Sequence, residues 1–288
     1  MTLMNTVTQD ASSGPRSLRA WLEQGPFTLV LSSGFFGFYA HTGMLSSLLE
    51  AGFAPARVAG CSAGALVGGA WAAGVPPQEL RERLMALERS AFWDPSFGPG
   101  LLAGKRFRAL LDELLPVRTF ADCQVPLTVS VFDVLAMRTV TCDAGELAPA
   151  IQASCTVPVM FHPVHSAGRW LVDGGLFDRP GLLSIARGER VLYHHLPSRV
   201  PWAPLRAALR RNAPQRPGLV SLTLETLPRA NPFQLELGRR ALEQAREQTQ
   251  RALDCPIEGD QVALPATPAA SQHRPHHGGL LRPPTTPR

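Results

Sequence analysis

The segment Val58-Ala59-Gly60-Cys61-Ser62-Ala63-Gly64 constrains the fold more strongly than any other part of the chain. A β-capable apolar stretch runs into Gly-x-Ser-x-Gly there, and small residues suited to a helix follow. This pattern is typical of a nucleophile elbow, a sharp strand-to-helix turn with a serine at its apex. A side chain at Gly60 or Gly64 is expected to collide with the neighbouring strand or helix. Ser62 is therefore a candidate nucleophile, although a tight glycine turn with an ordinary serine gives the same pattern.

The residues on either side of this turn predict an α/β fold. Phe27 to Leu31 is a short β-rich run that suits a buried parallel strand, and the glycine-containing loop 32–37 follows it. A helix is expected from about Tyr39 to Ala51, and a second strand from Arg57 to Gly60 leads into the elbow. This order of strand, glycine loop, helix, strand, glycine turn and helix predicts a three-layer α/β/α sandwich with a mainly parallel central sheet.

Further elements are predicted along the rest of the chain. Helices are expected at about 17–24, 76–89, 107–115, 145–153 and 232–253, and strands at 127–135, 138–142, 170–172, 191–194 and 219–224. Asn231 and Pro232 are expected to be the N-cap and first residue of the last helix. The polar face of this helix carries charges of both signs, which favours packing on the domain over lying on a membrane. The aromatic, Pro- and Gly-rich segment 92–104 is expected to form a loop over the site. We expect a flexible leader at 1–16, one domain at 17–255 and a disordered Pro-rich tail at 256–288.

The composition argues against several classes of function. No run of about 18 apolar residues is present, so no membrane-spanning helix is expected, and the N-terminus lacks the pattern of a secretory signal. Five scattered cysteines without a CxxC pair favour free thiols in a reducing compartment and argue against a zinc cluster. The net charge of +5 favours weak attraction to anionic surfaces, but no basic run with interleaved aromatics supports nucleic-acid binding. We expect a cytoplasmic protein without a metal that can lie peripherally on a membrane or lipid-droplet surface, with binding that falls as salt is added.

The second informative stretch is Trp170-Leu171-Val172-Asp173-Gly174-Gly175. A predicted strand delivers an aspartate into two glycines, Gly174 and Gly175, which leave space for another backbone or a ligand. A serine is a poor nucleophile until a base takes its proton, and Asp173 is a candidate for that base. The alternative is a turn-forming Asp-Gly pair without a catalytic role.

At these residues the chain resembles the patatin-like phospholipases. The signature of that family combines a Gly-x-Ser-x-Gly elbow, a later Asp-Gly-Gly motif and a glycine-rich oxyanion loop after the first strand. Here these are Gly60 to Gly64, Asp173 to Gly175 and Ser33 to Gly37, and the run 153–164 also looks like the family's segment before Asp-Gly-Gly. The resemblance covers roughly Phe27 to Pro180 in order, and weakly the helix at 232–253.

The resemblance implies a serine acyl hydrolase of lipid esters, of the phospholipase A, lysophospholipase or acylglycerol lipase type, that needs no cofactor. Ser62 and Asp173 would form a catalytic dyad without histidine. Ser62 would attack an ester carbonyl, Asp173 would accept its proton and return it to the leaving alcohol, and water would hydrolyse the acyl-enzyme. Because an isolated aspartate near its reference pKa of about 4 is a weak base, such a dyad needs a dry site and a strong oxyanion hole.

The predicted oxyanion loop departs from the common family pattern Gly-Gly-Gly-x-Arg/Lys-Gly. The stretch from Ser33 to Gly37 has fewer glycines, and it looks closer to the Gly-Phe-Leu-Gly form of animal triacylglycerol-lipase members. It also lacks the basic residue that would favour an anionic head group. Since the donors are backbone N–H groups, we expect the oxyanion hole to consist of the amides of Gly34, Phe35, Phe36 and Ala63.

Two further expectations concern this loop and the helix after it. Gly34 is expected to need a positive φ or a close approach of backbone, because both of its neighbours carry a β-carbon. About half of the four aromatic residues Phe35, Phe36, Phe38 and Tyr39 are expected to line an acyl channel, with the others in the core.

Other interpretations stay open at the level of the sequence. The same dyad would serve acyl transfer to an alcohol, and a catalytically silent module that binds lipid or a partner is a further alternative. His194 and His195 end a predicted strand and would suit the Ser-Asp-His order of ordinary α/β-hydrolases, although that fold places several strands before its nucleophile. Cys61 is interpreted as a packing residue, His41 and His162 as structural, and Asp133 and Asp143 as solvated residues near strand ends.

Overall fold

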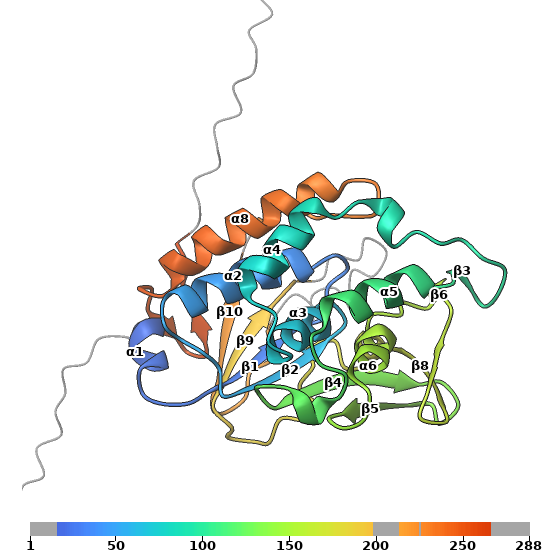
Figure 1. The fold of residues 1–288 in the computed structure, drawn as a ribbon. Coiled ribbons are helices and arrows are strands. Elements are labelled where there is room, and N and C mark those ends of the chain that lie inside the picture. The colour runs from blue at the N-terminus through green and yellow to red at the C-terminus, as the bar shows by residue number, and fades with distance from the viewer. Residues whose placement is uncertain (1–15, 198–212, 225, 266–288) are drawn as a thin grey trace, which may run out of the picture.

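The structure is a computed structural model that describes residues 16–197, 213–224 and 226–265 (Figure 1). It confirms the predicted α/β fold with a central, mostly parallel sheet. The strands are β1 (Thr28–Leu31), β2 (Arg57–Cys61), β3 (Gly100–Leu102), β4 (Leu127–Asp133), β5 (Arg138–Cys142), β6 (Val159–Phe161), β7 (Val164–Ser166), β8 (Arg169–Asp173), β9 (Val191–His195), β10 (Leu219–Thr223), β11 (Ile257–Glu258) and β12 (Gln261–Val262). The helices are α1 (Leu18–Leu22), α2 (Phe38–Glu50), α3 (Ala63–Ala72), α4 (Pro77–Ala86), α5 (Lys105–Leu114), α6 (Leu147–Ser154) and α8 (Leu235–Ala252), with short 3-10 turns η1 (Arg89–Ala91), η2 (Phe120–Asp122) and η3 (Gly174–Leu176).

The central sheet extends to both sides of β1, whose residues are all buried. Its strand order is β11-β12-β10-β9-β1-β2-β4-β8-β7, and the strands from β10 to β4 are parallel to one another. β5 and β8 both pair antiparallel with β4, and β7 pairs antiparallel with β8. The carboxyl ends of β1, β2 and β4 therefore meet at one edge of the sheet, which is where ligands bind in open α/β sheets.

The two faces of the sheet are covered differently. The larger apolar cluster contains buried residues of every described α-helix, together with strand residues such as Leu29 and Leu31. The smaller cluster covers the opposite face, where Val30 and Tyr193 join Ile185 and Ala213. Because successive strand residues point to opposite faces, the three consecutive residues 29–31 alternate between the two clusters. Figure 1 shows the helices α2, α4 and α8 together above the strands.

The last helix begins later than its sequence predicts. α8 starts at Leu235 after the N-cap Gln234, and not at Pro232. The side-chain oxygen of Asn231 accepts a 2.9 Å hydrogen bond from the Phe233 amide, so Asn231 forms a local turn ahead of the helix. Asparagine serves both purposes, because the same side chain caps helices and closes turns.

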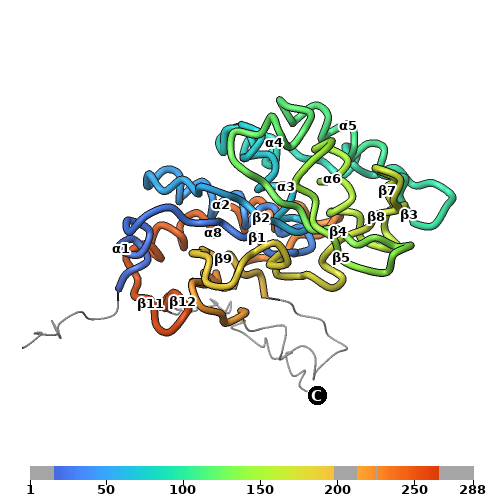
Figure 2. Tube along the Cα trace, turned by 90° about the horizontal axis from the view of Figure 1, so that it is seen from below, coloured from blue at the N-terminus to red at the C-terminus, as the bar shows by residue number. Residues whose placement is uncertain are grey.

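The predicted tail also begins too early at 256. Within the described residues, β11 and β12 form a hairpin, β12 pairs with β10, and Pro256 bridges to Ser17 beside α1 (Figure 2). The Gly259-Asp260 turn of this hairpin is a two-residue hairpin signal that the Pro-rich composition after it obscures. Residues 1–15 of the predicted leader and 266–288 of the predicted tail lie outside the described residues.

Candidate active site

Ser62 lies at a strained turn between β2 and α3. Its φ of 55° and ψ of −121° are neither helical nor extended, which is the geometry of a nucleophile elbow. A Cβ on Gly60 would lie 2.5 Å from the carbonyl oxygen of Gly64, and a Cβ on Gly64 would overlap the carbonyl oxygen of Leu31 in β1. The backbones of β1, β2 and the first turn of α3 therefore pack too closely to admit a side chain at either glycine.

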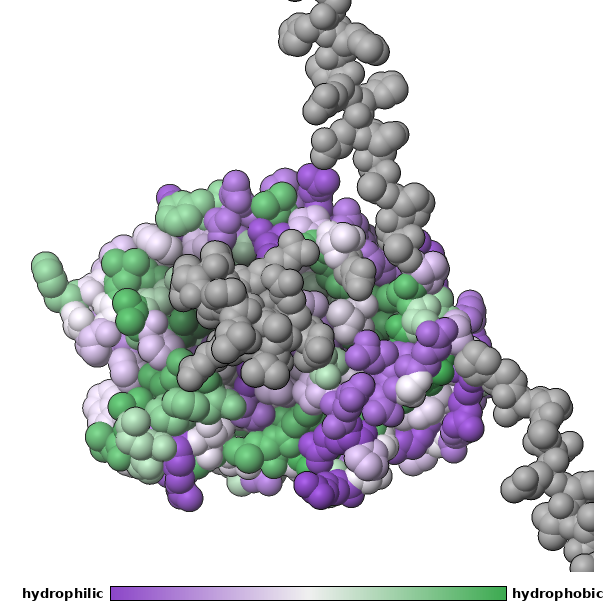
Figure 3. All heavy atoms as spheres, turned by 180° about the vertical axis from the view of Figure 1, so that it is seen from behind, coloured by the Kyte–Doolittle hydropathy of each residue, from purple (hydrophilic) through white to green (hydrophobic). Residues whose placement is uncertain are grey.

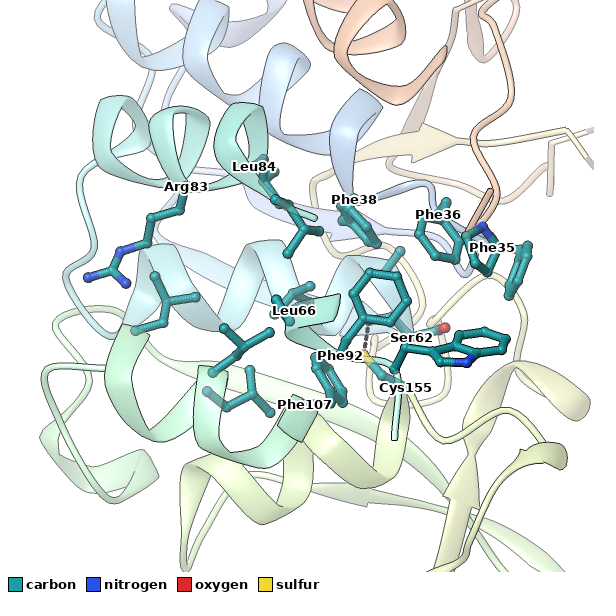
Figure 4. Close-up of a pocket in the computed structure, with 18 of the residues that line it drawn as sticks. Phe35, Phe36, Phe38, Ser62, Leu66, Arg83, Leu84, Phe92, Phe107 and Cys155 are labelled. Carbon is teal, nitrogen blue, oxygen red and sulfur yellow. Dashed lines mark hydrogen bonds between the residues drawn. The ribbon is translucent and has the colours of Figure 1, made fainter. Parts of the chain in front are cut away.

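Both backbone groups of Ser62 are held by residues at the end of α6. The Ser62 N–H donates to the Ser154 hydroxyl at 2.8 Å, and this hydroxyl donates to the Ser130 carbonyl of β4 at 2.7 Å. The Cys155 thiol donates to the Ser62 carbonyl at 3.2 Å (Figure 4). These bonds hold a turn whose conformation alone costs about 1–3 kcal/mol. No sequence pattern marks Ser154 or Cys155 individually, although both lie in the family-like run 153–164.

The register of two strand pairs places Asp173 and Ser62 at the same edge of the sheet. Cys61 at the end of β2 pairs with Ser130 of β4. The next residue of β4, Val131, pairs with Asp173 at the end of β8. The antiparallel β8 thus delivers Asp173 to the same edge of the sheet at which β2 delivers Ser62.

The carboxyl group of Asp173 is buried, with 6% of the residue exposed. It accepts a 2.7 Å hydrogen bond from the Gly175 amide, and the Cys61 thiol lies 3.9 Å away. Burial raises the pKa of Asp173 to about 6, against hydrogen bonds from the Ser62 side chain and the Gly175 amide that lower the pKa. Asp173 is therefore ionised at neutral pH, yet it is a stronger base than an exposed aspartate.

The glycines after Asp173 make room for the neighbouring chain. A Cβ on Gly174 would lie 2.5 Å from the carbonyl oxygen of Ser130. A Cβ on Gly175 would lie 2.5 Å from Oγ of Ser33 in the loop after β1. The Asp-Gly-Gly motif therefore packs directly against both β4 and the predicted oxyanion loop.

The loop after β1 turns at Phe36 and not at Gly34. The Gly37 N–H donates to the Gly34 carbonyl at 2.8 Å and closes a four-residue turn in which Phe36 has a φ of 55°. The expectation of a positive φ or a close backbone approach at Gly34 is wrong: its φ is not positive, and a Cβ there would meet Cδ1 of Leu196 at 2.7 Å. Leu196 is a flexible side chain, so it can move where a backbone cannot.

The four residues whose amides are predicted for the oxyanion hole line one pocket together with Ser62. They belong to Gly34, Phe35 and Phe36 in the loop and to Ala63 at the first position of α3. Within the described residues, none of these N–H groups donates a hydrogen bond to another protein group. Donors that are available in this way are what an oxyanion hole requires.

The pocket beside Ser62 has a volume of about 500 Å³ (Figure 4). Its walls are mainly apolar and come from the loop after β1, α3, α4, α5 and the segments around η1 and β6. Ser62 lies at one end, and Arg83 of α4 lies on the side away from it. A cavity of this size and lining suits a hydrocarbon chain whose reacting end lies at Ser62.

The aromatic residues divide between this pocket and the core. Phe35, Phe36 and Phe38 line the pocket, whereas Tyr39 is fully buried and its hydroxyl donates to the Leu84 carbonyl at 3.3 Å. The segment 92–104, predicted as a loop over the site, contributes Phe92, Trp93 and Leu102 to the walls and includes β3, which pairs with β6. The ring of Phe92 is buried there, so it is a wall residue and not part of an exposed aromatic loop.

His41 and His194 form a buried pair beneath the loop after β1. Their Nδ1 atoms lie 2.8 Å apart, and His41 Nε2 lies 2.8 Å from the Ser32 carbonyl oxygen. Because a carbonyl only accepts, His41 donates through Nε2 and accepts through Nδ1 from His194. Burial lowers the pKa of His41 to about 4 and lowers that of His194 well below its usual value.

This pairing bears on the alternative Ser-Asp-His triad. A catalytic histidine is oriented by an aspartate at Nδ1. In this structure, Nδ1 of His194 bonds to His41, and Nδ1 of His195 bonds to the Tyr193 hydroxyl at 3.1 Å. The geometry therefore does not favour a triad built on His194 or His195.

The remaining candidate residues have structural contacts. Cys61 is buried, and burial raises the pKa of its thiol well above the usual value, which disfavours the thiolate nucleophile. His162 Nε2 lies 3.0 Å from the Gly100 carbonyl. The expectation that Asp133 is solvated is wrong, because it is buried and accepts from the Leu135 and Ala136 amides in the β4–β5 turn. Asp143 is exposed as predicted.

The helices that the structure describes include none that combines the length and the apolar character needed to cross a bilayer.

The chain matches the model of a known protein family. The model described as patatin-like phospholipase matches residues 29–184, which span β1, the elbow and the Asp-Gly-Gly motif. Curated relatives from Mycobacterium bovis and Mycobacterium tuberculosis, both described as uncharacterized NTE family proteins, are 31% identical to this chain over 176 residues. The aligned region is 60% of this chain and 49% of each relative, so the chain spans about half the length of these curated relatives.

A solved structure shares the fold. VipD from Legionella pneumophila is similar over 86% of this chain and 72% of that chain, with a TM-score of 0.56. The two sequences are 15% identical over this region, so the likeness concerns the arrangement of the elements alone.

Proposed function

Because the chain belongs to the patatin-like phospholipase family, we propose that it is a serine acyl hydrolase of lipid esters in which Ser62 is the nucleophile and Asp173 is the base. The family itself supports a lipid hydrolase. The roles of the two residues rest on one observation: the strand register places the buried carboxyl group of Asp173, whose pKa is raised to about 6, beside the elbow serine at the end of an apolar pocket.

The first half of the reaction forms an acyl-enzyme. Asp173 accepts the proton of the Ser62 hydroxyl while the Ser62 oxygen attacks the ester carbonyl carbon. The negative charge that develops on the carbonyl oxygen is stabilised by N–H groups from the loop after β1 and from Ala63, with the N-terminus of α3 adding its dipole. The intermediate collapses when the bond to the alcohol oxygen breaks and Asp173 returns the proton to that oxygen.

The second half regenerates the enzyme. A water molecule gives one proton to Asp173 and attacks the acyl carbon, and a second oxyanion forms in the same place. The bond to the Ser62 oxygen then breaks, Ser62 takes the proton back, and a fatty acid leaves. The apolar walls of the pocket bind the acyl chain in both halves. The burial of Asp173 keeps its carboxylate poorly solvated and thus basic.

The proposal is tested by covalent labelling with a fluorophosphonate and by mass spectrometry of the labelled peptide. We expect modification of Ser62, no modification in Ser62→Ala, and labelling slowed about a hundredfold or more in Asp173→Asn. Ser90→Ala is the matched control, because Ser90 borders the same pocket but lies outside the elbow. The labelling rate of the wild-type protein should fall as the pH is lowered through about 6, where Asp173 takes up a proton.

Other results would contradict the proposal in distinct ways. An unlabelled Ser62 in folded protein would identify a catalytically silent member of the family. Loss of labelling in His194→Ala with full labelling in Asp173→Asn would replace the dyad by a triad. Transfer of the acyl group to an added alcohol, without release of fatty acid from phospholipid or triacylglycerol, would identify an acyltransferase that uses the same dyad.

A further inference from the structure

The exposed large apolar side chains gather around the edge of the sheet that carries the site. In the described part of the chain eleven such side chains are exposed, and Leu183 alone belongs to the segment that crosses the opposite face of the sheet. The other ten lie in segments at the carboxyl ends of β1 and β4, at the two ends of β8, or around the pocket. They are Phe35, Phe97, Leu101, Leu135, Met137, Val159, Trp170, Leu176, Phe177 and Phe233. Figure 3 shows apolar residues concentrated on the side that bears these segments, and more hydrophilic residues on the opposite side. Single exposed apolar residues are common, but such a concentration is not.

One group of these side chains adjoins the pocket. Phe35 lines the pocket and is 52% exposed. Phe233 lies against Trp93, another lining residue, with ring centroids 5.8 Å apart. Phe97 and Val159 are 104% and 82% exposed; Phe97 precedes β3, and Val159 is the first residue of β6, which pairs with β3. These side chains therefore project from separate segments that also contribute residues to the walls of the pocket.

A second group flanks Asp173. Leu135 and Met137 occupy the β4–β5 turn, and the backbone carbonyl of Trp170 in β8 accepts from the Val134 amide beside them. Phe177 follows the Asp-Gly-Gly motif, and its ring lies 4.9 Å from that of Phe132 in β4. Exposed apolar side chains are therefore present both around the pocket and beside the strands β4 and β8.

Two of the exposed apolar residues also have an unfavourable backbone conformation. Met137 has a φ of 51° and Val159 a φ of 70°, in the left-handed region that suits glycine. For a β-branched residue such as Val159 this is an uncommon conformation, and its exposure means that burial does not offset the strain. Strain and exposure together indicate that these side chains serve something other than the stability of the isolated chain.

From this arrangement we infer that the ten side chains, called the tips below, form a docking face. The docking face inserts the tips into a lipid–water interface and brings the pocket entrance against the lipid. The inference rests on the proposed function, because the docking face adjoins the pocket that the acyl chain of a substrate would enter. The tips project from several separate turns. A fluid hydrocarbon layer accommodates separate tips without shape complementarity, whereas a protein partner needs a continuous, closely packed surface.

The test separates binding from chemistry. Full-length Ser62→Ala protein is mixed with phosphatidylcholine vesicles, and the bound fraction is measured by flotation. In this background, the added substitutions Phe97→Ser and Val159→Ser are expected to lower partitioning at least about tenfold, because each removes an exposed apolar side chain. The matched control is Leu183→Ser, which removes an exposed apolar side chain outside the docking face and is expected to leave partitioning unchanged. In the active protein, the tip substitutions should slow hydrolysis of vesicle lipid but not of a water-soluble short-chain ester.

Three results would overturn the inference. The first is unchanged vesicle binding in the tip variant, and the second is an equal loss of binding in Leu183→Ser. The third is self-association that the tip substitutions abolish, in protein that does not bind vesicles, because it would identify the docking face as an interface between copies of the chain. A protein that binds vesicles through its tips but hydrolyses no ester would leave the docking face intact and refute the proposed function instead.

Discussion

The elbow at Ser62 and the loop turn at Phe36 line the same pocket, and both residues have a φ of 55°, but they are held in different ways. The N–H and carbonyl of Ser62 bond to side chains of α6 and the residue after it, and the flanking glycines touch backbone. The turn at Phe36 is closed by one bond between Gly37 and Gly34. The Phe36 ring packs against two other aromatic rings: its centroid lies 5.3 Å from that of Phe38 and 5.9 Å from that of Phe92.

This difference explains why one motif follows the family pattern and the other does not. Where backbone touches backbone, as at Gly60 and Gly64, glycine alone fits and the motif is fixed. Where the neighbours are side chains, as around Gly34 and Phe36, a change at one position is absorbed by movement of another. The elbow is therefore expected to be intolerant of substitution and the loop to be tolerant.

The largest expected effect compares one added methyl group in the two regions. In Gly64→Ala the new Cβ overlaps the Leu31 carbonyl, so we expect a loss of about 3 kcal/mol or more in the free energy of unfolding. In Gly34→Ala the new Cβ comes too close only to the flexible end of Leu196 and is otherwise in ordinary contact, so the loss should stay below about 1 kcal/mol. Chemical denaturation measures both losses. Similar losses in the two variants would remove the distinction between the elbow and the loop.

A smaller effect on stability is expected from Asp173→Asn, which should raise the free energy of unfolding at pH 7. The pKa of Asp173 rises from 3.8 to about 6 on folding, so the folded state takes up a proton that the unfolded state does not take up between these pH values. The wild-type protein therefore loses stability as the pH rises through this window, by about 3 kcal/mol in total. The asparagine amide carries no charge to bury, so the variant should be more stable than wild type at pH 7 and equal to it near pH 4. Unfolding curves at the two pH values measure the difference, and a variant less stable at pH 7 would contradict the assigned electrostatics.

Ser154→Ala should reveal how much the support of the elbow contributes. The change removes the acceptor of the Ser62 N–H and the donor to the Ser130 carbonyl, and it leaves both groups buried. We expect a loss of about 2 kcal/mol in stability together with slower fluorophosphonate labelling of Ser62. Ser33→Ala is the matched control in the loop, where removing the hydroxyl should change stability by less than about 0.5 kcal/mol. Unchanged labelling in Ser154→Ala would mean that the elbow keeps its geometry without this bond.

The smallest expected effect isolates the strain in the loop. Phe36→Ala and Phe36→Gly both remove the ring, but glycine alone adopts a φ of 55° without steric cost. We therefore expect the glycine variant to be more stable than the alanine variant by about 1 kcal/mol, against the usual order of the two residues. Thermal unfolding of the pair measures this difference. The usual order would show that the loop relaxes once the ring is gone.

The same contrast explains what the sequence predicts and what it does not. The fold and the juxtaposition of Gly60 to Gly64 with Asp173 to Gly175 follow from local patterns, because strands, glycine turns and their order leave few topologies. The turn at Phe36 does not follow, because its positive φ falls on a phenylalanine and not on a glycine. The bonds from Ser154 and Cys155, and the pairing of His41 with His194, depend on the packing of α6 and α2 that no local pattern encodes.

The central position of β1 also affects how the chain assembles as it is synthesised. Residues 28–31 pair on one side with residues 57–60, which are made soon afterwards, but on the other side with residues 191–194. Until those residues are made, the middle of the future sheet is an open strand edge, available to any other extended chain. The elbow and Asp173 both lie in the part of the chain made before that edge closes. Errors of strand pairing at this edge are therefore possible until β9 has been translated.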